Sequence, residues 1–237
     1  MPYKYEEGHN YPRLNELFHE FASFLGGLHT MYIESIIGYS WIHRHVVNHQ
    51  NSIKELLGEC EVTEQEFQNE CSITYKSICG VDITPALLSP VMKQGDVLSR
   101  NSPGGQNEIV IGQQCIVSVY SYWEEYLRLE IAKAKGLVAE EASLTNQVKE
   151  ILAEHLSFDI WGDIRHLRNS IVHNNGMATK ECGKETKIFK WFKEGESISL
   201  PYNIMRRIFL EIAIFRNQIH SWSLPRHYIS IPNSRQG

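Results

Sequence analysis

The sequence lacks a long apolar segment. No stretch has about 18 consecutive apolar residues without charge, the length that a membrane-spanning helix requires. The first ten residues, MPYKYEEGHN, also lack the apolar core of a secretory signal. We therefore expect a protein that does not span a membrane and that is located in the cytoplasm.

Cysteine is scarce and irregularly placed. The chain has five cysteines, an odd number, and none of them forms a CxxC pair. This spacing argues against a zinc knuckle and against a disulfide framework, so we expect reduced and buried thiols. The five residues are Cys60, Cys71, Cys79, Cys115 and Cys182.

Motifs of several catalytic classes are missing as well. The SPGG loop at residues 102–105 is not followed by the Lys-Ser/Thr pair of a phosphate-binding loop, which argues against nucleotide hydrolysis of that kind. His45 and His49 lie one helical turn apart and could begin a metal site, but no third ligand is evident. Histidines at the surface or at a helix end are the better interpretation, so we predict neither a metal nor another cofactor.

Charge is unevenly distributed along the chain. The formal charge is −5, but residues 1–163 have 11 Lys/Arg against 23 Asp/Glu, a net charge of −12, and residues 164–237 have 12 against 5, a net charge of +7. A polyanion would be attracted to the second part. The alternative is that the two parts attract each other within the fold or across a dimer. A third hypothesis is that the acidic part mimics or masks nucleic acid for the basic part.

Apolar residues recur at the spacing of helices in the first half of the chain. Intervals of three and four predict an amphipathic helix over about residues 14–49, which Gly26, Gly27 or Gly38 could break or kink. The capping-box sequence TEQE, which begins at Thr63, predicts the start of a short helix.

The loop RNSPGGQN, residues 100–107, is the place where we expect a domain boundary, if there is one. An N-terminal helical extension over residues 1–100, which could also be part of the same domain, would then precede a domain over 106–237. Within the extension, Thr84 before Pro85 predicts a further helix start.

The second half predicts three helices, a hairpin and a last helix. The three helices extend from after the loop to about Lys135, from about Ser143 to His155, and from about Phe158 to an Asn-Asn-Gly stop. KIFKWF and SISL flank the turn residues KEGE, which predicts a small β-hairpin, and Pro201 begins the last helix. We therefore predict a mainly α fold, a helical bundle with a small β-hairpin before the last helix.

The third of these helices carries the stretch RHLRNSIVHNNG, residues 165–176. Its apolar stripe consists of Ile160, Ile164, Leu167 and Ile171. Arg168 lies at the edge of that stripe, where a guanidinium loses water and needs a carboxylate or a phosphate as its partner. Within the chain, the expected partners are Glu124 and Glu125 of the preceding long helix.

Arg168, Asn169 and His173 form an arginine, a polar residue directly after it, and a histidine after four intervening residues, near the end of a helix. This pattern resembles the signature of the HEPN superfamily, many of whose members are metal-independent ribonucleases. The resemblance covers about residues 106–222 and implies a HEPN-like helical bundle. The same spacing from Arg44 to His49 lies in the acidic part and does not precede a helix stop followed by a hairpin.

The resemblance implies an endoribonuclease that leaves a 2′,3′-cyclic phosphate and a 5′-hydroxyl. His173 would serve as proton acceptor or donor, and Arg168 would hold the phosphate and stabilise the developing charge. Asn169 would orient His173 or donate to a phosphate oxygen. Because one histidine per chain must supply two proton roles, the resemblance also implies a homodimer with a composite active site.

The biological role that the resemblance implies is a toxin or anti-phage defence effector that cuts cellular RNA and is restrained by a regulatory or antitoxin partner. The alternative is a non-catalytic HEPN-like module that dimerises and binds nucleotide, RNA or a partner protein. In that case Arg168 would pair with a carboxylate. His173 would then only cap the helix end, where the helix dipole favours its protonated form.

Further RNA-binding candidates lie in the basic part of the chain. Lys190 and Lys193 flank Trp191 in FKWFK, and together they could neutralise and stack on single-stranded RNA. The more ordinary interpretation is a hairpin with one packed face. Arg165 is a candidate on the same helix as Arg168.

Overall fold

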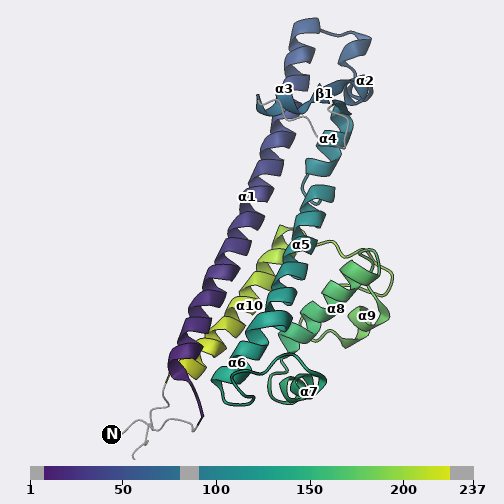
Figure 1. Ribbon diagram of the computed structural model, residues 1–237. Helices are drawn as coiled ribbons and strands as arrows, with labels where there is room; N and C mark the ends of the chain where they lie inside the picture. Colours follow the sequence, from purple (N-terminus) through teal and green to yellow (C-terminus); the bar gives the residue numbers. More distant parts are fainter. Residues whose placement is uncertain (1–7, 81–90, 225–237) are drawn as a thin grey trace, which may run out of the picture. The chain divides into compact units, whose positions relative to one another are not determined.

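The computed structural model describes residues 8–80 and 91–224 (Figure 1). As predicted, these residues are mainly helical, with a small antiparallel sheet. In chain order, the elements are α1 (Tyr11–Leu57), η1 (Glu61–Thr63), α2 (Gln65–Glu70), β1 (Ser72–Thr74), α3 (Tyr75–Cys79), β2 (Val91–Lys93), α4 (Gln94–Asn101), α5 (Gln106–Tyr122), η2 (Trp123–Leu127), α6 (Arg128–Ala134), α7 (Asn146–His155), α8 (Asp159–His173), α9 (Lys180–Glu185) and α10 (Tyr202–Ser223).

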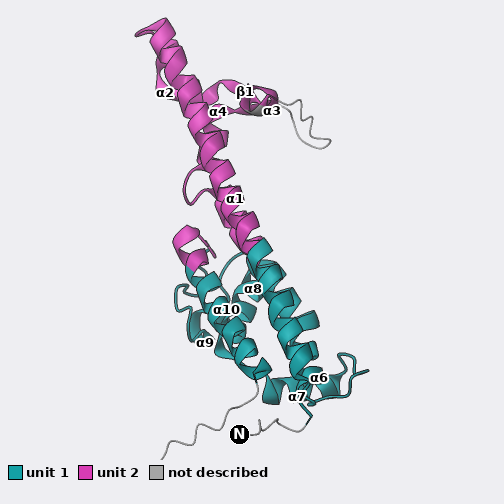
Figure 2. Ribbon diagram, turned by 90° about the vertical axis from the view of Figure 1, so that its left-hand side faces the viewer, with its two compact units in different colours: residues 1–27, 116–197, 207–237 teal, residues 28–115, 198–206 magenta. Residues whose placement is uncertain are grey.

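The chain divides into two compact units (Figure 2). Unit 1 consists of residues 1–27, 116–197 and 207–237, and unit 2 consists of residues 28–115 and 198–206. Helices α1, α5 and α10 therefore each contribute residues to both units. The loop between α4 and α5 lies inside unit 2, so the compact units do not coincide with the expected division at residues 100–106.

Unit 1 has an aromatic core. Trp123 of η2 stacks on Trp161 of α8 with ring centroids 4.6 Å apart, and Phe215 of α10 packs edge-on against both rings. The predicted apolar stripe of α8 is buried at Ile160, Ile164 and Leu167, while Ile171 is partly exposed. The same helix that carries the candidate motif is therefore held by its opposite face in the core.

Unit 2 has a separate small core of buried apolar side chains, formed by Val46, Ile73, Ile78 and Val97. Strands β1 and β2 pair in antiparallel register next to it, with Ile73 opposite Met92. The hydroxyl of Thr74 accepts a hydrogen bond from the Ser77 amide and so caps the start of α3.

Helix α1 is continuous through all three of its glycines, so none of them breaks the helix. A Cβ atom at Gly26, Gly27 or Gly38 would meet no atom within 4 Å, and these glycines are thus not sites of close approach. Leu25 and Leu28, on either side of the glycine pair, are both buried.

Helix α2 forms where the capping-box sequence predicted a short helix, but its start differs from the predicted one. Glu64, not Thr63, occupies its N-cap position. Thr63 ends η1 instead, and its hydroxyl accepts from the amide of Cys60. The predicted helix start at Thr84 lies outside the described residues.

The helices of the second half form as predicted, but the hairpin does not lie where it was expected. Residues 187–200 contain no strand, and only an isolated bridge joins Met177 to Ser197. The small sheet pairs residues 72–74 with residues 91–93 instead. The physical reason is that the Asp163 carboxylate accepts the backbone amides of residues 187–189, the donors that a hairpin ladder would need.

The cysteines for which the structure gives a state, Cys60, Cys71, Cys115 and Cys182, are all free thiols. Burial is confirmed for Cys115 and Cys182, and it raises the pKa of Cys115 to about 12. For Cys60, which is exposed, the prediction of burial was wrong. None of the helices within residues 8–80 and 91–224 is long and apolar enough to cross a bilayer.

Candidate active site

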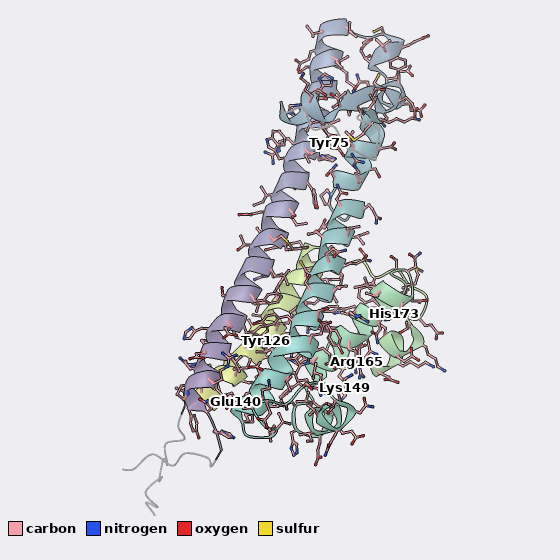
Figure 3. All side chains as sticks on the ribbon, in the orientation of Figure 1. Tyr75, Tyr126, Glu140, Lys149, Arg165 and His173 are labelled. Carbon is pink, nitrogen blue, oxygen red and sulfur yellow. The ribbon has the colours of Figure 1, made fainter. Side chains whose placement is uncertain are left out.

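The candidate site is built on the last two turns of α8. Leu167 is completely buried, whereas Arg168 and Asn169 directly after it are half-buried and His173 is exposed. Because consecutive helix positions are about 100° apart, packing of the apolar stripe turns the polar residues toward its edge and the surface. Figure 3 shows His173 at the end of α8 and Arg165 toward its start.

Arg168 and His173 are in direct contact. Nη1 of Arg168 lies 2.9 Å from Nε2 of His173 and 3.2 Å from Oδ1 of Asn169. A guanidinium can only donate, so Nε2 of His173 accepts this hydrogen bond and carries the lone pair. Nε of Arg168 is buried without a hydrogen-bond partner in the described residues, and Nη2 has none there either. The arginine therefore has donors left for a ligand.

The helix stops directly after His173, as the Asn-Asn-Gly sequence predicted. Asn175 and Gly176 have φ values of 50° and 76°, the left-handed conformation that Asn and Gly tolerate. The amide of Gly176 donates to the carbonyl of Ser170 at 3.1 Å, which closes the last turn.

Two buried polar residues of α8, which sequence reasoning missed, fasten the following loop to the helix. Asp163 accepts from the amides of residues 187, 188 and 189 at 2.7 to 2.8 Å. The hydroxyl of Ser170 accepts from the amide of Thr179 at 3.1 Å and donates to the carbonyl of His166. The available signal was the seven-residue spacing of Asp163 and Ser170, which places both on the packed side of the helix.

The expected pairing of Arg168 with Glu124 or Glu125 was wrong. Glu124 accepts instead from Arg128 at 3.2 Å, four residues later in the same helical run. Arg128 also donates to the carbonyls of Leu152 and Leu156 and so satisfies the end of α7. A carboxylate one helical turn away is held by local geometry, and the more distant Arg168 cannot compete with it.

Arg165 lies one helical turn before Arg168 and is exposed. Tyr120 of α5 is half-buried within electrostatic range of both arginines. Burial raises the pKa of this phenol and the Glu124 carboxylate adds to the effect, while the positive charges of Arg165, Arg128 and Arg168 oppose it. Unit 1 thus brings three arginines around one tyrosine, a juxtaposition that sequence reasoning did not find.

The FKWFK candidates lie in the loop that Asp163 holds. Lys190 and Lys193 are exposed. Trp191 is half-buried, stacks on Phe189 at 4.6 Å, and has the guanidinium of Arg207 over its ring at 5.7 Å. The tryptophan is already engaged within the chain, while the role of the two lysines in binding RNA stays a prediction.

Of the two histidines that could begin a metal site, His45 has other contacts. Nε2 of His45 lies 3.1 Å from the carbonyl oxygen of Ser77, and the His45 ring stacks on Trp41. His49 is exposed. Over the described ranges, no three His, Cys, Asp or Glu side chains come together as a metal site.

Comparison with family models, with curated proteins and with solved structures found no match to this chain.

Proposed function

We propose that this protein is a metal-independent endoribonuclease of HEPN type that acts in the cytoplasm. The observation that supports it is the 2.9 Å contact between Arg168 and His173 at an exposed helix end. A proton-transfer group and a fixed cation that can hold a phosphate are the minimum requirement for cleaving RNA through its own 2′-hydroxyl.

In the proposed reaction, the 2′-oxygen attacks the adjacent phosphorus while the bond from phosphorus to the 5′-oxygen breaks. Nε2 of His173 gives up its hydrogen bond from Arg168 when the phosphate binds the guanidinium and takes the proton of the 2′-hydroxyl, and a second group returns a proton to the departing 5′-oxygen. Arg168, whose Nη2 has no partner in the described part of the chain, stabilises the phosphorane-like transition state. The products are a 2′,3′-cyclic phosphate and a 5′-hydroxyl.

Asn169 would orient Arg168, in addition to the role as donor to a phosphate oxygen that the sequence pattern implied. Its carbonyl oxygen accepts from Arg168 rather than contacting His173. Asn169 therefore orients the guanidinium. Its amide nitrogen is a donor and would bind a phosphate oxygen of the substrate. Arg165, Lys190 and Lys193 would extend the positive surface along the RNA strand.

The second proton-transfer group comes, in this proposal, from a second copy of the chain. Val172, next to His173, and Met177, four residues after it in the chain, expose 46% and 38% of their surface. Apolar side chains at an exposed active site support a homodimer that buries them and places two copies of His173 in one cleft. A nuclease of this kind needs restraint, so we propose a toxin or anti-phage defence effector that is held by a regulatory or antitoxin partner.

The test is cleavage of a labelled RNA by the purified protein in excess EDTA. Two control reactions use the same oligonucleotide with deoxyribose throughout and the His173→Ala protein. His49→Ala is the matched control, because His49 is an exposed helical histidine with the same RxxxxH spacing to Arg44. We expect cleavage by the wild type and by His49→Ala, only at ribose, and none by His173→Ala.

Two other results would count against the proposal. If folded dimeric wild type leaves several types of RNA intact, the protein is the non-catalytic binding module. If cleavage survives His173→Ala, other residues carry the reaction.

A further inference from the structure

Helix α1 presents a regular exposed stripe in unit 2. Its positions follow one another at intervals of four, three, four, three and four residues, which is the spacing of a seam where one helix packs against another. All of these side chains are exposed, and all belong to the part of α1 that lies in unit 2 (Figure 2). The α1 stripe consists of Thr30, Glu34, Ile37, Trp41, Arg44 and Asn48.

The centre of the α1 stripe is apolar. Ile37 exposes 62% of its surface and Trp41 exposes 49%, although both lie in the middle of a 47-residue helix. The Trp41 ring is held in place, because it stacks on His45 with ring centroids 5.4 Å apart. Large apolar side chains that are exposed side by side on one helix face are typical of an interaction surface, and tryptophan contributes strongly to such surfaces.

Two residues of opposite charge flank this apolar centre. Glu34 lies three residues before Ile37, and Arg44 lies three residues after Trp41. Neither Glu34 nor Arg44 has a hydrogen bond or an ion pair with another side chain in residues 8–80 and 91–224. Both charges are therefore available to a partner.

The α1 stripe is complementary to itself in one arrangement. When two copies of the helix pack antiparallel about a two-fold axis midway between Ile37 and Trp41, residues at equal distances from the axis face each other. Ile37 of each copy then faces Trp41 of the other. Glu34 of each copy likewise faces Arg44 of the other. A parallel pair would instead place Glu34 on Glu34 and Arg44 on Arg44, and like charges that face each other repel.

We propose that the α1 stripe is a self-association surface, on which a second copy of this chain packs antiparallel through the same residues. Each copy contributes two large apolar side chains and two exposed charges, so the contact is small, and the association is weak and depends on protein concentration. The inference does not rest on the proposed ribonuclease function, because the α1 stripe lies in unit 2 and the motif lies in unit 1.

The test reverses the charges of the stripe and measures self-association of the full chain. Sedimentation equilibrium covers about a hundredfold range of protein concentration, over which a weak association becomes visible. All proteins also carry Val172→Asp, which places a charge at the proposed active-site contact and so removes association through that site. Glu34→Arg and Arg44→Glu each place like charges opposite each other twice, so each should weaken self-association at least about tenfold.

The sharpest measurement mixes the two charge-reversal variants. A Glu34→Arg chain has two positive side chains in its stripe, and an Arg44→Glu chain has two negative ones. A mixture should therefore associate at least as well as the unreversed protein, although each variant alone associates poorly. Glu66→Arg on α2 is the matched control, because it changes the net charge equally at an exposed position outside the stripe, and it should have no effect.

Ile37→Ser tests the apolar centre. This substitution should also weaken self-association at least about tenfold, because the contact loses a large apolar side chain. The control is Leu56→Ser on the same helix, since Leu56 is 85% exposed but lies outside the stripe. Circular dichroism should show both variants to be folded, because neither side chain is buried.

Three results would overturn the proposal. A protein with Val172→Asp alone that stays monomeric at every concentration would leave the α1 stripe without a second copy as its partner. Self-association that survives both charge reversals would belong to another surface. A mixture that associates no better than its two components would exclude the antiparallel arrangement. RNA cleavage is not measured in these experiments, so their failure leaves the proposed nuclease untouched.

Discussion

Nη1 of Arg168 donates a hydrogen bond to Nε2 of His173 over 2.9 Å across the last turn of α8. This contact joins two side chains five residues apart, one half-buried and one exposed. In this contact Nε2 of the histidine is the acceptor, because a guanidinium can only donate.

Arg168→Lys should lower the rate of RNA cleavage by about 10²- to 10³-fold, because lysine keeps the charge but loses the planar fork that contacts His173, Asn169 and a phosphate together. The measurement is the initial rate in EDTA, with Arg44→Lys as the matched control. A rate within a few-fold of the wild type would mean that Arg168 contributes only its charge.

Asp163→Ala should lower the free energy of unfolding by about 3 to 4 kcal/mol, because three backbone amides lose a buried carboxylate acceptor. The matched control is Asp159→Ala on the same helix, where an exposed carboxylate binds only the Lys187 ammonium. Urea unfolding should show little change for the control. Equal effects of the two substitutions would contradict the role of Asp163 as the anchor of the loop.

Val172→Asp should prevent formation of the homodimer and abolish cleavage, because a charge would be buried where two copies of the active site meet. Val110 of α5 is 43% exposed and belongs to unit 2, so Val110→Asp is the matched control. Sedimentation velocity gives the oligomeric state. A Val172→Asp protein that remains dimeric and active would refute the composite site.

Arg13→Met should make the protein less stable at neutral pH by about 1 kcal/mol, a value discounted for solvent screening. Arg13 donates to Glu20 at 2.7 Å and to Glu130 at 3.0 Å within unit 1. The hydroxyl of Tyr126 also donates to Glu20, and this bond together with Arg13 lowers the pKa of Glu20. Burial would raise the pKa of Glu130, but its hydrogen bonds from Lys133 and Arg13 outweigh burial and lower it.

The lowered pKa values of Glu20 and Glu130 determine how the stability of the protein changes with pH. Carboxyls with a lowered folded-state pKa stabilise the protein above their ordinary pKa of about 4.5, and this stability is lost as the pH falls through the folded-state value. The difference between the wild type and Arg13→Met should thus be largest near pH 7 and vanish in acid. Unfolding curves across this range, with Arg44→Met as control, test it. A difference that is independent of pH would exclude the charge network as its cause.

Local patterns in the sequence predicted the helices well. Helix hydrogen bonds join residues four apart, so periodicity and end signals are legible within a short window. The start of α10 after Pro201 and the stop after His173 are examples. The hairpin was placed wrongly because the competing acceptor, Asp163, lies more than 20 residues away in the chain.

The candidate site, like the fold, was predicted from the sequence only in part. The spacing of Arg168, Asn169 and His173 is enough to predict that they lie near one another, since residues within two turns of a helix are neighbours. The sequence did not predict which partners these side chains take: Glu124 pairs with Arg128, four residues later, and Arg168 contacts His173.

The sequence by itself determined the mainly helical class, the position of the motif at a helix end, and the uneven charge, because all three depend on residue type and short spacing. Only the tertiary structure decided that Asp163 anchors the loop after α9 and that Trp161 has an unpaired N–H beside Tyr120. Such contacts join residues far apart in the chain. They depend on how α8 packs against α5 and against the loop after α9, which no local pattern encodes.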